Sequence, residues 1–153
     1  MKKIIETKSA EATAELGAAL AKTLQGGDVV ALSGDLGGGK TTFVKGLARQ
    51  LGVTKTVISP TFLIEKIFKI STWPVPGRLH HFDVYRLSEP TDLLSLGWEE
   101  LVADKNNLIV VEWADKVASL MPPQTIWVRF VFVSDNVRKI EIDRPRQNSK
   151  NLL

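Results

Sequence analysis

The stretch Gly34-Asp35-Leu36-Gly37-Gly38-Gly39-Lys40-Thr41-Thr42 decides how this chain folds, because it fills the pattern G-x-x-x-x-G-K-[ST]. A short apolar run, residues 29–32, precedes it, and a helical pattern, residues 43–51, follows it. A strand, a glycine-rich loop and a helix in this order are the context in which the pattern binds phosphate. The stretch therefore predicts an α/β protein with the P-loop NTPase fold, a mixed central sheet flanked by helices.

The residues of the loop are of types that can bind an anion. Gly37, Gly38 and Gly39 have no Cβ atom, so their backbone N–H groups can approach a ligand closely and form an anion nest. The helix that begins near Lys40 adds its positive N-terminal end. Lys40 can reach the β- and γ-phosphates, and the Thr41 hydroxyl can bind Mg²⁺. We predict an ATP-binding set of Gly34, Leu36, Gly37, Gly38, Gly39, Lys40, Thr41 and Thr42.

Length and composition limit the other possibilities. The chain has 153 residues, a formal net charge of +3 and no cysteine, which favours one domain and excludes disulfide bonds and thiolate metal sites. The N-terminus lacks the apolar region of a signal peptide, and no apolar run approaches the roughly 20 residues that span a bilayer. We expect one domain over residues 1–142, a basic and flexible tail over residues 143–153, a cytoplasmic location and no membrane contact.

Two acids follow predicted strands. Glu112 comes directly after four apolar residues, 108–111, that read as a strand buried on both faces. An acid in that place can hold Mg²⁺ and polarise an attacking water, or it can simply face the dipole of a following helix. Asp83 lies in an apolar and aromatic stretch, residues 79–86, where α/β sheets present ligands. Its alternative role is that of a strand-end turn residue or an ion-pair partner of Arg86.

Two further features carry open alternatives. In Ser59-Pro60-Thr61 a proline-fixed turn could hold the Thr61 hydroxyl beside a γ-phosphate, or it could be ordinary turn chemistry. His80 and His81 are adjacent in the strand 79–86, and neighbouring side chains on a strand point to opposite faces. The spacing therefore disfavours a metal site made by the pair.

The remaining elements follow from periodicity and turn signals. We predict a helix from Ser9 as N-cap to Leu24, a strand over 63–70, a turn-rich connector over 71–78, and a helical region over 93–102 that Gly97 interrupts. Residues 2–5 form a short strand or lead into the first helix. The other predicted elements are a short helix over 114–120 and a terminal antiparallel hairpin of strands 124–133 and 137–142.

Four stretches in this order resemble the bacterial TsaE (YjeE) family: residues 34–42, Ser59-Pro60-Thr61-Phe62, residues 81–87 with His81-Phe82-Asp83-Val84-Tyr85-Arg86-Leu87, and Val110-Val111-Glu112-Trp113. The first stretch alone is typical of any P-loop NTPase. The combination with the other three is specific to the family, and the resemblance covers most of residues 9–120.

The resemblance implies a cytoplasmic ATPase needed for threonylcarbamoyl modification of adenosine 37 in tRNA. Members bind ATP with Mg²⁺ and act with the TsaB–TsaD pair, in which TsaD is the transferase. ATP hydrolysis is weak in the isolated protein, is stimulated in the complex and resets it between turnovers. Whether the chain touches tRNA directly stays open, and no DNA partner is implied. By the same resemblance, residues 7–12 lie near the base.

The resemblance also assigns site residues. Thr41 and Glu112 are implied as Mg²⁺ ligands, and Asp83, Glu112 and Thr61 as catalytic residues, with Thr61 in a switch beside the γ-phosphate. It implies functional positions without a defined role at Trp113, Ser59, His81, Tyr85 and Arg86.

Other functions compete with this one. The first alternative is a small P-loop metabolite kinase, which needs an acceptor pocket and usually an arginine-bearing lid. Arg78 and Arg86 are the only arginines between Arg49 and Arg129, and no lid insertion is visible. A GTPase is disfavoured because no N-K-x-D-like sequence follows Glu112. A nucleotide-dependent binding module with negligible turnover differs from the ATPase mainly in rate.

Overall fold

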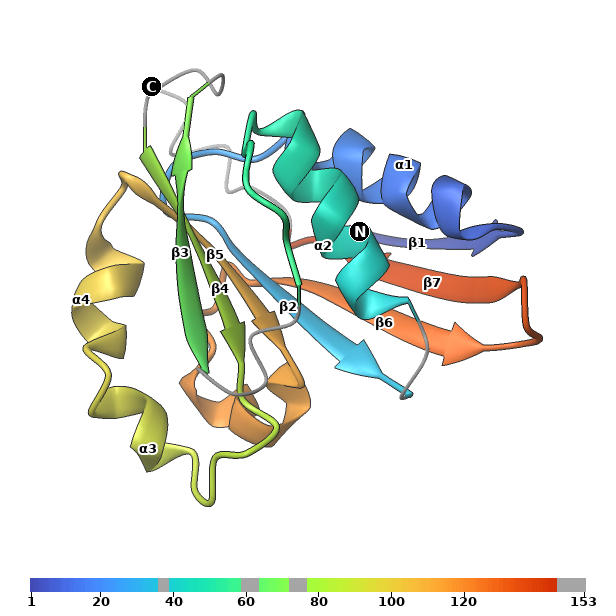
Figure 1. Cartoon of the computed structure of the whole chain (residues 1–153). Coiled ribbons are helices and arrows are strands. Elements are labelled where there is room, and N and C mark those ends of the chain that lie inside the picture. Colours follow the sequence, from blue (N-terminus) through green and yellow to red (C-terminus); the bar gives the residue numbers. More distant parts are fainter. Residues whose placement is uncertain (36–38, 59–63, 72–76, 146–153) are drawn as a thin grey trace.

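A seven-stranded mixed sheet, in the order β1-β7-β6-β2-β5-β4-β3, runs through the molecule (Figure 1). The computed structural model describes residues 1–35, 39–58, 64–71 and 77–145. The strands are β1 (Lys2–Thr7), β2 (Val29–Gly34), β3 (Glu65–Ile70), β4 (Gly77–Asp83), β5 (Asn107–Glu112), β6 (Ile126–Phe132) and β7 (Arg138–Asp143). The helices are α1 (Ala10–Ala21), α2 (Lys40–Gln50), α3 (Thr91–Leu94), α4 (Trp98–Ala103) and the 3₁₀ helix η1 (Ala114–Leu120). The mixed α/β fold expected from the sequence is confirmed.

The centre of the sheet is parallel and its margins are antiparallel. β2 pairs in parallel with both β5 and β6, and β5 pairs in parallel with β4. β3 joins β4, β7 joins β6, and β1 joins β7, all antiparallel. The carboxyl ends of β2, β4 and β5 therefore lie at one edge of the sheet, which is the place where open parallel sheets bind ligands.

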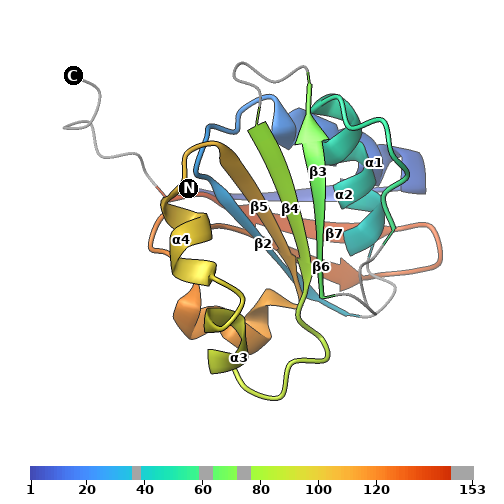
Figure 2. The same ribbon diagram turned by 60° about the vertical axis from the view of Figure 1, so that its left-hand side comes forward.

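Helices cover both faces of the sheet (Figures 1 and 2). α1 and α2 lie on one face, where the apolar side chains of the sheet form a core with Phe43, Leu47 and Phe130. α3, α4 and η1 lie on the other face, over a second core that contains Phe82 and Trp98. β2 and β5 are buried from both sides, as their continuous apolar runs predict.

The crossing of α1 and α2 depends on two glycines. A Cβ atom on Gly46 would lie 1.8 Å from the carbonyl oxygen of Ala14, and one on Gly17 would lie 2.1 Å from that of Phe43. Only glycine allows the two helix backbones to approach this closely. The contact fixes α2, whose first turn follows the glycine loop, against α1.

Several boundaries differ from the sequence expectations. Residues 2–5 do form a strand, which extends to Thr7 because it pairs with β7. The first helix ends at Ala21 rather than Leu24, and its expected N-cap, Ser9, accepts the N–H of Ala12 at 3.0 Å. Gly97 separates α3 from α4 with a φ of 80°, as predicted.

The ends of β4 and β7 also differ from the predicted strand ends. The strand expected over residues 79–86 ends at Asp83, because Asp83 begins a turn, so Tyr85 and Arg86 lie beyond it. β7 extends to Asp143, and Arg144 donates to Thr23. The rest of the tail predicted over residues 143–153, from residue 146 on, lies outside the described residues. No helix in the described part of the chain is long and apolar enough to cross a membrane.

Candidate functional site

The glycine loop leads from β2 into α2 at the carboxyl edge of the sheet. Gly39 is the N-cap of α2 with a φ of 98°, and no side chain caps the helix or places an acid in its first turn. The first turn thus has no side-chain cap among the described residues, and N–H groups at such a helix start can bind an anion. Gly34 has a φ of 125°, and a Cβ atom there would lie 2.1 Å from the Phe130 carbonyl oxygen on β6. Leu36, Gly37 and Gly38 lie outside the described residues.

Lys40 is buried at the start of α2, with 6% of its surface exposed. Its Nζ atom donates to the carbonyl oxygens of Gly34 at 2.7 Å and Asp35 at 3.2 Å. The same atom lies 3.9 Å from the centre of the Trp113 ring, within the range of a cation–π contact. The ammonium group is thus held at the loop by backbone oxygens and one aromatic face.

The surroundings of Lys40 shift its pKa in two opposite directions. Burial lowers the pKa of Lys40 below its ordinary value of 10.5 because water no longer solvates the charge. Four carboxylates oppose this shift and raise the pKa: Glu112, Asp115, Asp83 and Asp35. The site therefore combines one cation with several acids, an arrangement suited to a phosphate group that carries a bound cation.

Thr41 and Glu112 meet although 71 positions separate them in the chain. The Thr41 hydroxyl donates to Glu112 Oε1 at 3.1 Å, and the other carboxylate oxygen, Oε2, lies 2.6 Å from His81 Nε2. Glu112 is 2% exposed and His81 is fully buried. One carboxylate at the end of β5 is thus shared by α2 and β4.

Asp83 lies beside this carboxylate at the end of β4. The parallel register places Asp83 opposite Glu112, and Asp83 is 3% exposed. Its Oδ1 atom accepts the N–H of Tyr85 at 3.0 Å, which is the strand-end turn role that the sequence left open. Its charge also acts on Lys40, so the side chain belongs to the same electrostatic site.

Trp113 follows Glu112 with a φ of 62°, an uncommon value for a residue with a large side chain. This backbone turn places its ring 4.9 Å from that of Tyr85, between centres, and over Lys40. Lys116 donates to the Tyr85 carbonyl oxygen at 2.9 Å. Arg86 is exposed on the turn beyond. The predicted residues Ser59 and Thr61 lie outside the described residues.

A second group of residues beside the loop was not predicted as a site. A hollow of about 110 Å³ adjoins Gly39 and is lined by Ser9, Ala10, Thr13, Gly39, Thr42, Asp135, Asn136 and Arg138. The β6–β7 turn supplies Asp135 and Asn136, and the start of β7 supplies Arg138. The sequence carried no signal for them because that turn reads as an ordinary hairpin. Of the other lining residues, Gly39 and Thr42 belong to the predicted ATP-binding set, and Ser9 and Ala10 lie in the segment 7–12 that the family resemblance implied.

Thr41 and Glu112 suit a Mg²⁺ ion that also binds phosphate and water better than a metal ion held by protein ligands alone. The described residues contain no group of three or more His, Cys, Asp or Glu side chains placed to hold a metal ion. Thr41 and Glu112 offer one hydroxyl and one carboxylate. Mg²⁺ in nucleotide sites uses one or two such ligands and completes its shell with waters and phosphate oxygens. The residues present therefore fit a Mg²⁺–nucleotide complex.

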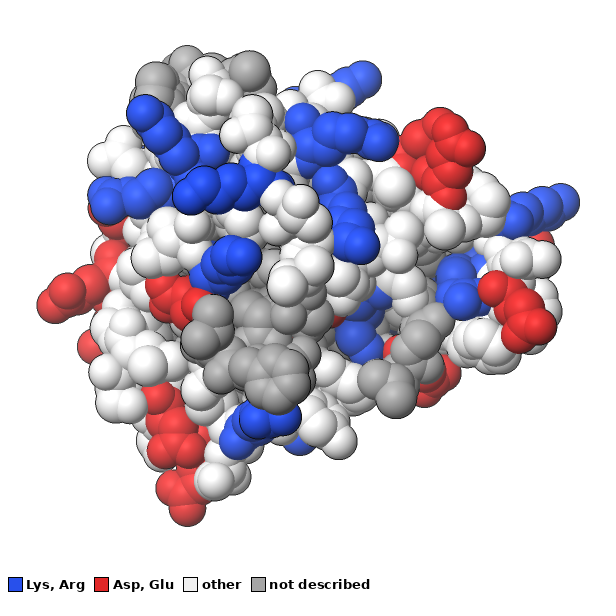
Figure 3. Space-filling model, viewed as in Figure 1, with Lys and Arg blue, Asp and Glu red and all other residues white. Residues whose placement is uncertain are grey.

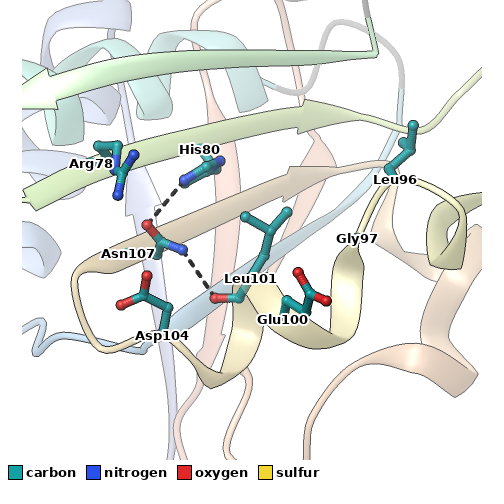
Figure 4. A pocket seen from close by; sticks show the side chains of 8 residues that line it. All are labelled: Arg78, His80, Leu96, Gly97, Glu100, Leu101, Asp104 and Asn107. Carbon is teal, nitrogen blue, oxygen red and sulfur yellow. Dashed lines mark hydrogen bonds between the residues drawn. The ribbon is translucent and has the colours of Figure 1, made fainter.

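A separate pocket of about 260 Å³ lies on the opposite face of the sheet, between β4, β5 and α4 (Figure 4). His80 faces it, with Nδ1 3.2 Å from Glu65 and Nε2 3.1 Å from Asn107. His81, the next residue, faces α2. The prediction that the two histidines point to opposite faces is confirmed.

Basic side chains gather over the end of the molecule formed by β3, β4 and the chain after α2 (Figure 3). Lys55, Lys69 and Arg78 line one open hollow there, and Lys69 lies opposite Arg78 in the β3–β4 register. None of the predicted site residues that the structure describes lines this hollow.

Comparisons with known proteins give one consistent result. The sequence model of the family described as threonylcarbamoyl adenosine biosynthesis protein TsaE matches residues 7–140. A Treponema pallidum protein named tRNA threonylcarbamoyladenosine biosynthesis protein TsaE is 37% identical over 138 residues, which cover 89% of this chain and 96% of that protein. The Bacillus subtilis protein of the same name is 38% identical over 136 residues, covering 89% of this chain and 80% of that protein.

A solved structure agrees with these relatives. The crystal structure of Bacillus subtilis YdiB superposes with a TM-score of 0.76 at 30% sequence identity, covering 94% of this chain and 86% of that chain. The matched region contains the glycine loop, the ends of β4 and β5, and both helices that pack on the loop's side of the sheet. The chain therefore belongs to the TsaE family of tRNA threonylcarbamoyladenosine biosynthesis proteins.

Proposed function

We propose that this chain is a Mg²⁺-dependent ATPase with a P-loop site, and that it serves threonylcarbamoyl modification of adenosine 37 in tRNA. The observation that carries the proposal is the meeting of three groups at the end of β2: the uncapped start of α2, the buried Lys40 ammonium, and the Thr41–Glu112 pair. Each group matches one part of a bound Mg²⁺–ATP complex.

The phosphates are bound by α2 and Lys40. The N–H groups of the first helical turn point along the helix axis toward the loop, and the helix dipole favours negative charge there. Lys40 already lies at the loop with its stem buried, so a phosphate oxygen can replace one of its two carbonyl acceptors. The absence of an acid in the first turn of α2 leaves this end positive.

Thr41 and Glu112 hold the metal ion, whose charge offsets that of the phosphates when it is bound. Glu112 and Asp83 lie side by side at the ends of β5 and β4, where they orient a water and accept its proton. Thr61 is proposed as the γ-phosphate sensor on the family resemblance. The base is placed in the hollow beside Gly39, where Arg138 and Asn136 offer polar groups.

The wider role rests on the family. We assign the TsaB–TsaD pair as partner, with ATP hydrolysis in this chain resetting that pair, and we assign the threonylcarbamoyl transfer itself to the partner. Isolated activity is therefore weak and rises in the assembly. We assign the protein to the cytoplasm on the same family resemblance. Trp113 and Tyr85, whose rings lie 4.9 Å apart between centres and are tilted by 49°, are suited to sense whether nucleotide is bound, since Lys40 contacts the Trp113 ring.

The test compares ATP hydrolysis by the chain alone with hydrolysis in the presence of the TsaB–TsaD pair, together with tRNA modification. We expect stimulation by the pair, and loss of both activities in E112Q, which keeps the shape of the side chain but removes its charge. ATP binding by E112Q is expected to persist. An absence of stimulation, or modification without this chain, contradicts the assigned role, and ATP-dependent phosphorylation of a metabolite supports the kinase alternative.

A further inference from the structure

His81 makes one contact that the nucleotide site does not itself require. It lies on β4, two residues before Asp83, and its ring is fully buried on the α2 side of the sheet. Nε2 lies 2.6 Å from Glu112 Oε2, at the short end of the range for a hydrogen bond. The other oxygen of the same carboxylate, Oε1, accepts the Thr41 hydroxyl at 3.1 Å. The two oxygens of Glu112 are thus divided between two donors.

The hydrogen-bonding pattern fixes which nitrogen of His81 carries the proton. An ionised carboxylate only accepts hydrogen bonds, so Nε2 must be the donor. Nδ1 is buried and has no hydrogen-bond partner among the described residues. A proton on Nδ1 would find no acceptor in the described part of the chain. The contact with the carboxylate therefore places a proton on Nε2.

We propose that His81 is a positioning residue that clamps Glu112 Oε2 through its Nε2–H group, so that Oε1 alone is presented to Thr41 and to a bound Mg²⁺. This inference rests on the proposed ATPase function. Without the clamp the carboxylate can rotate about its terminal bond and exchange its oxygens. Groups that orient a metal ligand in this way typically contribute about 10–100-fold to metal affinity or activity.

Three substitutions separate clamping from packing. H81Q places an amide nitrogen near the position of Nε2, so it keeps the donor to Glu112. H81N places its amide nitrogen near the position of Nδ1, one bond too short to reach. H81L fills the volume and donates nothing. H81N is thus a polar control for H81Q, and H81L is an apolar one.

The measurement is ATP affinity by calorimetry, once with Mg²⁺ and once with EDTA. The factor by which Mg²⁺ strengthens binding is expected to stay within about threefold of the wild type in H81Q, and to fall about tenfold or more in H81N and H81L. Affinity in EDTA is expected to be unchanged in all three. Equal Mg²⁺ effects in all variants, or an H81Q as impaired as H81N and H81L, would overturn the proposal.

A second measurement needs neither metal nor a substituted side chain. Long-range ¹H–¹⁵N spectra of the metal-free protein report which imidazole nitrogen is protonated. We expect the Nε2–H tautomer for His81, and an Nδ1–H tautomer would overturn the clamp even if a variant fails to fold. If the ATP affinity of the wild type does not change with Mg²⁺, the proposed function is contradicted instead. The tautomer would still show whether His81 donates to Glu112.

Discussion

Lys40→Ala tests the phosphate site most directly. The substitution removes an ammonium group whose Nζ atom contacts Gly34 O, Asp35 O and the Trp113 ring. A hydrogen bond between a charged donor and a phosphate contributes roughly 1.5–3 kcal/mol. Lys40 gives up part of its existing contacts when phosphate binds, so we expect a net loss near the middle of that range, about 2 kcal/mol.

That loss corresponds to about 30-fold weaker ATP binding, since about 1.4 kcal/mol is a factor of ten. Calorimetry with Mg²⁺–ATP measures it. Lys45→Ala is the matched control, because Lys45 is exposed on the same helix and its removal changes the net charge equally. We expect the control to stay within twofold of the wild type. A Lys40→Ala affinity within twofold of the wild type, or an equal loss in both variants, would refute the direct contact.

Three further predictions concern the same region. Because burial lowers the pKa of Lys40 below 10.5, calorimetric ATP affinity is expected to fall with rising alkaline pH before an ordinary lysine would titrate, and Lys40→Ala should lack this decline. Between the lowered pKa of Lys40 in the folded protein and the ordinary value of 10.5, the unfolded chain binds more protons than the folded one. The free energy of unfolding of the wild type should therefore rise with pH in this range, relative to Lys40→Ala. Thr41→Val should leave ATP affinity in EDTA unchanged but raise the Mg²⁺ concentration that half-saturates ATP binding, and an unchanged Mg²⁺ requirement would remove Thr41 from the metal site. Gly46→Ala should lower the free energy of unfolding in urea by about 3 kcal/mol, because the added Cβ atom meets the Ala14 carbonyl. Gly97→Ala is the control: its Cβ atom meets no atom within 4 Å, but the φ of 80° should still cost about 1–2 kcal/mol. Equal losses in the two variants would contradict this account of the helix crossing.

Local patterns predicted the elements of this fold well. The glycine loop, the helix after it and the strand that ends at Glu112 each follow from residues that are adjacent in sequence. Gly97 also marks the break between two helices correctly, because a positive φ at a glycine is a local property. The pairing of β1 with β7 was not predicted, since it joins the two ends of the chain.

The site was harder to predict because its contacts are not local. The sequence indicated that Glu112 follows a buried strand, but not that His81 clamps it from a neighbouring strand 31 positions earlier. The hollow that contains Arg138 was missed for the same reason, since it joins α1 to the β6–β7 turn. Strand register brings these residues together, and a single sequence carries little information about register.

The position of β1 has a consequence for biosynthesis. β1 is made before all the other described strands of the sheet, and its partner β7 is made after them, since Lys2 lies opposite Asp143. Contacts between such distant residues are closed late and slow the folding of a chain. β1 therefore cannot pair with β7 until the residues between the two strands have been made. Lys2, Lys3 and Glu6 flank the two isoleucines of β1 and keep its unpaired edge charged, which discourages pairing with other chains.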